Sequence, residues 1–600
     1  MRLALLSLLP VCLTAQLVPV GQPVPRGPNP PVVFMNGYQI ACSGTDFASN
    51  FGAAAQLLQS FNIATLYFDN CTVPGKPSLE ALGLAFGQFL GALKYTDGTP
   101  VAQVDVIAHS MGGLILRSYL AGKQDISPAS FNPPATVPIR KAIFLGTPHF
   151  GTKVANLFGN DRQTEEMSLG SQFLFDLNTW NQGSDDLRGI TAVAIAANGG
   201  TGLESGTPGF DDGLVTLTSS SLAFVRPGIT RVVPYCHSTN SLLTTSGACS
   251  ASTPALNVLG NDPNSPVVQI VGSFLAGTDG WQKAGESGDT NALLASRAGL
   301  NVQLRDKTDT AISLIGGSVA TPGLTANLGV NTGSGVDYSE SLTANTSLSV
   351  QLTPMSGTVQ STTLKLPAGT VSPTIVKPGP VISPKGVIPA AGPAPFPYDV
   401  GPGAYVSIYG TNLASATQAA AIPYPLQIAD VQVLVNGVAA PMVFVSAGQI
   451  NFVYPASAAG LTQLTVKNSD GQHTVNVRVA PAVPSIFWLD ANGTAAALNA
   501  LTSTVVGAAT PLHAGDFLSL YLTGLGATTM TNGLDYAQIP PTITVGGRNL
   551  TVLYAGRTPG FAGLDQINCQ LPVGITTGTA VPVVVTSNGR VSPTAYIAIQ

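Results

Sequence analysis

Ser110 lies in a setting that suits a nucleophile. Residues 104–117 read VDVIAHSMGGLILR, which predicts a buried strand, a tight turn at Ser110 and then a helix. Small residues, Ala108 and Gly112, stand two positions before and after the serine, where the strand and helix backbones come close. Such a nucleophile elbow exposes the hydroxyl beside a helix N-terminus, which favours developing negative charge. The alternative is a serine in an ordinary strand-to-helix turn.

A serine hydroxyl is a weak nucleophile until a base takes its proton. The chain has five histidines, so the base can be sought by elimination. His237 follows the predicted strand 229–234, at the carboxyl end where the loops of a parallel sheet build sites. His473 and His513 fall in the C-terminal repeats, and His109 adjoins the serine. His149 follows the predicted strand 139–145, where we expect a structural role. We therefore expect His237 to be the base.

An acid must hold the imidazole in the right tautomer. The segment 209–221 (GFDDGLVTLTSSS) offers two neighbouring acids before His237. We favour Asp212, which directly precedes Gly-Leu-Val, and Asp211 remains the alternative. An oxyanion hole needs two N–H donors. We expect one from Met111, after the serine, and the other from Tyr38, in the loop after the first strand.

Residues 28–285 alternate between strand-like and helix-like segments. This alternation predicts an α/β domain whose mostly parallel sheet has helices on both faces. The expected strands are 31–36, 63–69, 103–107, 139–145, 190–197 and 229–234, and the expected helices are 50–61, 78–94, 111–121, 170–181 and 265–277.

The C-terminal half predicts all-β sandwich domains. Short runs of alternating apolar and polar residues favour a small sandwich at 300–366. A high content of Pro, Gly and Ala favours a linker at 367–402. An internal repeat follows: GAYVSIYGTNL (403–413) recurs as GDFLSLYLTGL (515–525), and GQINFVYP (448–455) as DQINCQLP (565–572). We expect two immunoglobulin-like units at 403–485 and 486–600, with Cys569 as an unpaired core thiol in place of Phe452.

The N-terminal residues, the composition and the cysteines predict an exported protein. Residues 1–15 read as a secretory signal peptide, and no later stretch is long and apolar enough to cross a membrane. Charged residues make up 9% of the chain, and the net charge of −5 gives no case for nucleic-acid binding. Local order favours the disulfides Cys42–Cys71 and Cys236–Cys249, with free buried thiols as the alternative.

Residues 31–285 resemble the bacterial lipase/esterase branch of the α/β-hydrolase superfamily. The matching pieces are VVFMNGY, AHSMGG, FLGTPHFGT, EEMSLGSQFLFDLNTW, DDGLV and the histidine loop, in the chain order Ser110, Asp212, His237. The resemblance implies ester hydrolysis through an acyl-enzyme, without a cofactor. It also implies a mobile apolar segment at about 153–188, for which a core helix is the alternative; its apolar residues are Phe158, Met167, Leu169, Phe173, Leu174, Phe175, Leu177 and Trp180.

Two departures from this family stand out. The oxyanion loop has Asn36-Gly37 where the family has His-Gly, which leaves acyl-chain preference open. Some related lipases bind calcium through an acid just after the histidine, whereas Ser238 and Thr239 follow here, so we expect no metal. The C-terminal units resemble IPT/TIG-like modules appended to exported bacterial proteins, and this resemblance implies no chemistry.

These patterns predict a secreted or cell-surface serine lipase or esterase acting on lipid or other esters. A phospholipase, an acyltransferase or a polyester depolymerase would use the same triad. A different alternative is an inactive protein whose β modules bind an insoluble surface or polymer.

Overall fold

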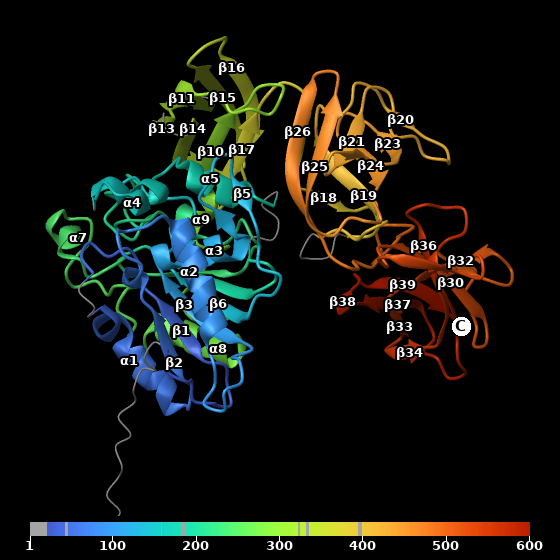
Figure 1. The fold of residues 1–600 in the computed structure, drawn as a ribbon, viewed down its shortest axis with the longest axis horizontal. Helices are drawn as coiled ribbons and strands as arrows, with labels where there is room; N and C mark the ends of the chain where they lie inside the picture. Colours follow the sequence, from blue (N-terminus) through green and yellow to red (C-terminus); the bar gives the residue numbers. More distant parts are fainter. Residues whose placement is uncertain are drawn as a thin grey trace, which may run out of the picture.

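The computed structural model describes residues 21–42, 46–157, 159–181, 187–321, 324–331, 335–393 and 399–600. The expected signal peptide, residues 1–15, and Phe158 lie outside these ranges. An α/β domain is followed by three β-sandwiches, the last two lying beside the rest of the molecule (Figure 1). Within the described residues, no helix combines the length and apolar character needed to cross a membrane.

The α/β domain is built on a seven-stranded sheet in the order β2-β1-β3-β6-β7-β8-β9. All neighbours are parallel except the short β9, which runs antiparallel to β8. This confirms the expected α/β fold. The strands are β1 Val32–Met35, β2 Thr65–Phe68, β3 Val104–His109, β6 Ile139–Leu145, β7 Thr191–Ala197, β8 Thr230–Val233 and β9 Glu286–Ser287.

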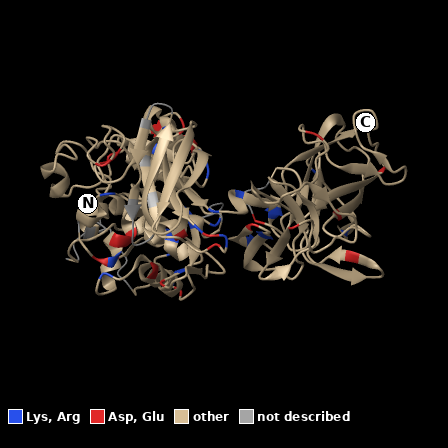
Figure 2. Ribbon diagram, turned by 90° about the horizontal axis from the view of Figure 1, so that it is seen from above, with Lys and Arg blue, Asp and Glu red and all other residues tan. Residues whose placement is uncertain are grey.

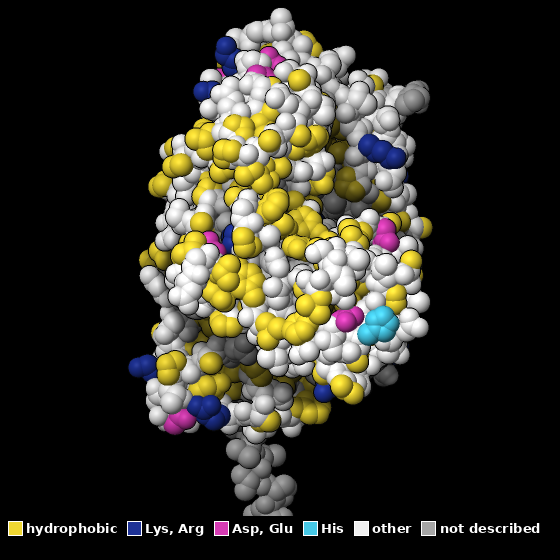
Figure 3. All heavy atoms as spheres, turned by 90° about the vertical axis from the view of Figure 1, so that its right-hand side faces the viewer, with side chains coloured by type: hydrophobic (Ala, Val, Ile, Leu, Met, Phe, Trp, Pro, Cys, Tyr) yellow, Lys and Arg dark blue, Asp and Glu magenta, His cyan; other side chains and the backbone are white. Residues whose placement is uncertain are grey.

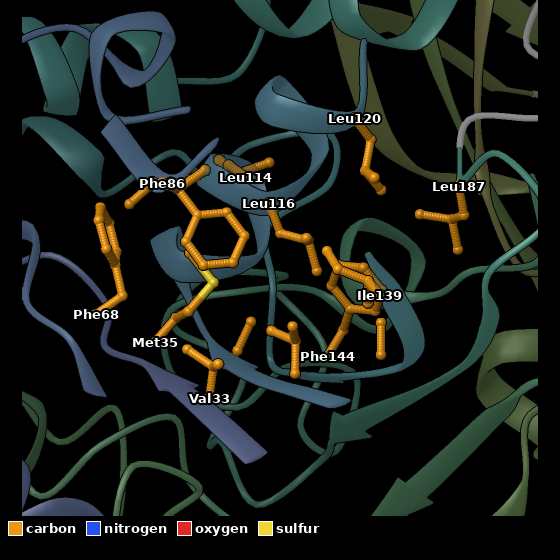
Figure 4. Packing of buried hydrophobic residues seen from close by; sticks show 14 of the residues in the cluster. Val33, Met35, Phe68, Phe86, Leu114, Leu116, Leu120, Ile139, Phe144 and Leu187 are labelled. Atoms are coloured by element: carbon orange, nitrogen blue, oxygen red, sulfur yellow. The ribbon is translucent and has the colours of Figure 1, made fainter. Parts of the chain in front are cut away.

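Helices cover both faces of this sheet. Successive residues of a strand point to opposite faces, so one strand contributes to the buried cluster on each side. Val33 and Met35 join a buried cluster with α2 and α3, whereas Val32 and Phe34 join a second cluster with α1 and α8. Figure 4 shows the first cluster, in which Met35 lies beside Phe86 of α2. The main helices are α1 Asp46–Ser60, α2 Leu79–Ala92, α3 Met111–Ala121, α5 Gln172–Thr179 and α8 Pro266–Ala276, each at its expected place.

The first sandwich extends into the expected linker. Its two sheets are β13-β14-β10-β17 and β12-β11-β15-β16, and β17 (Val371–Val376) pairs with β10 (Arg297–Leu304). The other strands are β11 Leu314–Thr321, β12 Leu324–Asn327, β13 Gly329–Asn331, β14 Val336–Thr343, β15 Ser347–Pro354 and β16 Gln360–Lys365. β18 (Val381–Pro389) then pairs with β19 (Tyr405–Thr411) of the next module. The linker prediction for 367–402 is thus wrong over these two strands. Both are edge strands, and the β18–β19 register shifts between Ile382 and Val387. Edge strands and register shifts are the places where a sheet accepts proline.

The repeated sequences form equivalent strand pairs. β19 pairs with β24 (Gln449–Val453), and β30 (Phe517–Thr523) pairs in the same way with β36 (Asp565–Gln570). Val406 stands opposite Phe452, and Leu518 stands opposite Cys569. Cys569 is buried and free, as its equivalence to Phe452 predicts.

The outer surface of the C-terminal modules carries many uncharged side chains. Lys, Arg, Asp and Glu are scattered along the chain with both signs interspersed (Figure 2). Apolar atoms are spread over the face that these modules present (Figure 3). The modules also contact the α/β domain, because Lys385 donates to the carbonyl of Phe224 and Leu461 packs against the α2–α3 core.

Helix α3 lies unusually close to its neighbours. A Cβ at Gly112 would come within 2.8 Å of the Asn36 carbonyl oxygen, and a Cβ at Gly113 within 2.1 Å of Thr147 Oγ1. The helix that follows Ser110 is therefore held against the loops after β1 and β6, and its position fixes that of the serine.

We expect Gly113→Ala to lower the free energy of unfolding by about 1–3 kcal/mol, since the added methyl overpacks a buried contact. Gly91→Ala is the matched control. Gly91 lies in α2, and its added Cβ meets nothing within 4 Å, so alanine should raise stability by up to about 1 kcal/mol. Denaturant titration measures both changes, and equal stabilities for Gly113→Ala and wild type would contradict the close packing.

Candidate active site

Ser110 stands between β3 and α3 with a strained backbone. All six residues of β3 are buried, and the serine has φ 53° and ψ −126°. A non-glycine residue at positive φ is costly and is typical of functional turns. The Ser110 N–H donates to the Leu145 carbonyl at 2.8 Å, which ties the turn to the end of β6. The serine side chain does not cap the helix, so its hydroxyl is available to another partner.

That partner is His237. Its Nε2 lies 2.9 Å from Ser110 Oγ, and its Nδ1 lies 2.8 Å from Asp212 Oδ2. A carboxylate only accepts hydrogen bonds, so Nδ1–H donates to Asp212 and Nε2 is left to accept the hydroxyl proton of Ser110. The structure therefore brings the three predicted residues into hydrogen-bond contact, and in the neutral imidazole this arrangement selects the tautomer whose Nε2 faces the serine.

The two neighbouring acids, Asp211 and Asp212, have different hydrogen-bond partners. Asp212 is buried; its second oxygen accepts from the Leu214 and Val215 N–H groups, and its carbonyl accepts from the His237 N–H at 2.8 Å. The Asp211 carboxylate instead accepts from Ser205 and from the Gly213 N–H. Asp212 faces the imidazole, and Asp211 shapes the loop that carries it.

The loop after β1 lies against the serine. A Cβ at Gly37 would come within 2.8 Å of Ser110 Cβ and 3.3 Å of Ser110 Oγ, so only glycine lets this backbone approach. The buried Asn70 donates to the Gly37 carbonyl at 2.9 Å. The carbonyl and N–H of a trans peptide point in opposite directions, so this bond fixes the direction of the Tyr38 N–H. Sequence patterns did not predict this role for Asn70.

The side chain of Tyr38 ties the same loop to a neighbouring segment. Its hydroxyl donates to Asp161 at 2.6 Å and accepts from Lys76 at 2.6 Å, and Lys76 also lies 3.1 Å from Asp161. Burial opposes ionisation of Asp161, but these contacts and the Thr164 N–H outweigh it and hold the pKa of this carboxyl below its usual value. Asp161 also caps α4 (Arg162–Met167).

The expected mobile segment divides into two parts. Phe173, Leu174 and Leu177 of α5 are buried in the main core, as the core-helix alternative predicts. Ala155 and Met167, from the earlier part, are buried in the same core and also line the pocket beside Ser110. Residues 158 and 182–186 of this segment lie outside the described residues.

His109 contacts the histidine loop instead of the serine. Its Nε2 lies 3.0 Å from the His237 carbonyl oxygen, so Nε2–H donates across 128 residues of sequence. Burial, with the nearby charge of His237, lowers the pKa of His109 to about 3, so the ring is neutral. The sequence position did not reveal this tie, because it depends on the loop after β8.

Gly146 is a second residue that sequence patterns did not single out. It has φ 55°, and a Cβ there would come within 3.1 Å of Asp212 Oδ2 and 3.2 Å of His237 Nδ1. Glycine is thus required beneath the acid–base pair. Its place directly after the buried strand β6, in Gly-Thr-Pro, is the signal from which it could have been found.

The remaining histidines contact other groups. His149 is buried between Phe144 and Phe224; burial and the charge of Arg117 lower its pKa well below the usual value. His473 accepts from the Ile382 N–H in the second sandwich, and His513 is exposed beside Asp516. The elimination that selected His237 agrees with these positions.

Two disulfides hold loops of the site. Cys42 is bonded to Cys71, which adjoins Asn70, and Cys236, which precedes His237, is bonded to Cys249. Both pairings are those expected from local order. They fix the loop after β1 and the histidine loop from outside the triad.

We expect His109→Phe to slow the labelling of Ser110 by a fluorophosphonate about ten- to hundredfold, because small displacements of a reacting group have effects of this size. His109→Gln should recover most of the rate, since its amide N–H can also donate to the His237 carbonyl. Mass spectrometry of the labelled peptide over time measures both. Equal rates for the Phe and Gln variants would show that the hydrogen bond does not position the base.

One family model and several solved structures are similar to parts of this chain. Residues 388–480 match the IPT/TIG domain model, and no curated protein matches the chain. Among solved structures, phospholipase PlaB from Legionella pneumophila is similar at 13% identity, covering 58% of this chain and 92% of that one, with a TM-score of 0.41. Lipase 1 from Pelosinus fermentans is similar at 11% identity over 38% of this chain and 95% of that one, with a TM-score of 0.25.

The lipase BlEst2 from Bacillus licheniformis is similar at 13% identity over 76% of this chain and 95% of that one, with a TM-score of 0.27. At these identities and TM-scores, the function is inferred from the geometry of the site. The chain consists of an α/β domain with a mostly parallel sheet, followed by all-β modules, and its IPT/TIG match covers residues 388–480.

Proposed function

We propose that this protein is a secreted serine hydrolase that cleaves carboxylic esters. The observation that carries the proposal is the hydrogen-bonded row from Ser110 Oγ through His237 to Asp212. The phospholipase, acyltransferase and polyester depolymerase alternatives would share this row, because they differ in the acyl acceptor or the leaving group and not in the nucleophile. The two disulfides support an extracellular or cell-surface location.

In the first half-reaction, Ser110 Oγ attacks the carbonyl carbon of the ester while its proton moves to His237 Nε2. The negative oxygen of the tetrahedral intermediate accepts hydrogen bonds from the Tyr38 and Met111 N–H groups. Removing one such donor typically costs about 10²–10³ in rate. The Asp212 carboxylate stabilises the imidazolium that has formed.

The intermediate then collapses. The bond between the carbonyl carbon and the alcohol oxygen breaks, and the proton on His237 Nε2 passes to that oxygen, which leaves as the free alcohol. In the second half-reaction, His237 takes a proton from water, and the resulting hydroxide oxygen attacks the acyl-serine. The proton returns to Ser110 Oγ as the carboxylic acid is released, so the enzyme is regenerated.

Replacing the nucleophile tests this proposal. We expect Ser110→Ala to lower kcat for p-nitrophenyl butyrate by at least about 10⁴, because no other group can form the acyl-enzyme. Ser60→Ala, at the exposed end of α1, is the matched control and should keep wild-type kcat. Thermal unfolding should be similar for all three proteins, and substantial turnover by folded Ser110→Ala would contradict the proposal.

A further inference from the structure

The pocket beside Ser110 has two chemically different walls. It is a cavity of about 410 Å³, and one wall is apolar and includes Ala155, Met167, Leu214 and Val215. Pro148 and, from the loop after β1, Ile40 and Ala41 add further apolar lining. The other wall is uncharged but polar, and its side chains come from the loops after β1 and β8, the start of α1 and the segment around residue 257: Asn36, Gln39, Ser49, Asn50, Ser238, Thr239, Asn240 and Asn257.

The polar wall is a connected hydrogen-bond network. Asn50 Nδ2 donates to Asn36 Oδ1 at 3.3 Å, and Asn257 Nδ2 donates to Asn50 Oδ1 at 3.2 Å. Asn257 also accepts from the Thr239 N–H and donates to the Thr239 hydroxyl oxygen. Within the described part of the chain, this network uses one of the two Asn50 N–H groups and only the acceptor side of the Thr239 hydroxyl. The second N–H group of Asn50 and the O–H group of Thr239 can therefore donate to a ligand.

Charge is absent from this lining. No Lys, Arg, Asp or Glu is found among the described residues that line the pocket. Lys76 and Asp161, which both contact the Tyr38 hydroxyl, form an ion pair with each other. A phosphate group would bring negative charge to a wall of neutral amides and hydroxyls with no cation to offset it, and an unpaired charge in a partly buried site is strongly disfavoured.

The position of the base identifies which part of an ester meets the polar wall. In the proposed reaction, His237 protonates the leaving alcohol, so the alcohol lies on the imidazole side of Ser110. Ser238 and Thr239 directly follow His237 and begin the polar wall. The acyl chain is then left to the apolar wall of Ala155 and Met167, where its burial is favourable.

Resting on the proposed ester hydrolysis, we propose that the polar wall is a subsite for the leaving group and that it takes an uncharged alcohol with free hydroxyl groups, such as a partial glyceride or an acylated sugar. Asn50, Thr239 and Asn257 are its specificity-determining residues. Hydroxyls of the alcohol replace water on this network, whereas an alkyl alcohol leaves it unpaired and a phosphorylated alcohol places a charge there.

Three esters with the same acyl group test this subsite: 1-butyrylglycerol, butyl butyrate and 1-butyrylglycerol 3-phosphate. We expect kcat/KM for 1-butyrylglycerol to exceed each of the other two by at least about tenfold, the effect of one or two neutral hydrogen bonds or of an uncompensated charge. A ratio near one, or faster cleavage of the phosphate ester, overturns the subsite.

Variants locate the preference. Asn257→Leu should bring the ratio of kcat/KM for 1-butyrylglycerol over butyl butyrate close to one. Thr239→Val, which has nearly the same shape as threonine, should lower the ratio in the same direction and serves as the test if Asn257→Leu does not fold. Asn264→Leu, at an exposed site outside the pocket, should leave both rates unchanged. An unchanged ratio in a folded Asn257→Leu or Thr239→Val protein overturns the subsite.

The test also separates this inference from the proposed function. If wild type cleaves both neutral esters equally and Ser110→Ala cleaves neither, ester hydrolysis stands and the alcohol subsite is refuted. If wild type cleaves none of the three esters, nor p-nitrophenyl butyrate, the proposed function fails and the subsite fails with it.

Discussion

The hydrogen bond between Ser110 Oγ and His237 Nε2 is the constraint on which the rest of this structure depends. It joins residues 127 positions apart in the sequence. A single hydrogen bond does not position two such distant residues, so the fold has to bring them together. The parallel sheet meets this requirement because the carboxyl ends of β3, β7 and β8 all reach one edge. Ser110 follows β3, Asp212 lies in the loop after β7, and His237 lies in the loop after β8. The order of the strands therefore determines which side chains can meet.

Bringing three loops to one edge places them within reach but does not fix them to a fraction of an ångström. The structure adds ties between backbones for this purpose: the His237 N–H donates to the Asp212 carbonyl, and the His237 carbonyl accepts from His109. Close packing does the same where no bond is made, as at Gly146. A histidine held through its own backbone keeps its ring in one orientation, which is the preorganisation that the proposed proton transfer needs.

Much of this arrangement could be predicted from the sequence, for reasons that differ between features. The strands of the α/β sheet are short, apolar and β-branched, so local pattern alone located them. The residue types found after those strands, in the chain order Ser, Asp, His, indicated Ser110 and His237 and left Asp211 as an alternative to Asp212. The ties through Asn70, His109 and Gly146 could not be predicted, because each depends on a contact between loops distant in sequence. The strands at 371–376 and 381–389 were missed because their proline content outweighed their alternating valines and isoleucines.

The proposed reaction requires Ser110 to carry the acyl group during turnover. It can be tested by mixing the protein with p-nitrophenyl butyrate, quenching with acid before the substrate is exhausted, and mapping butyrylated peptides by mass spectrometry. We expect one butyryl group, on Ser110, which disappears once the substrate has been consumed. Turnover with the butyryl group on another residue, or with Ser110 unmodified throughout, would contradict it.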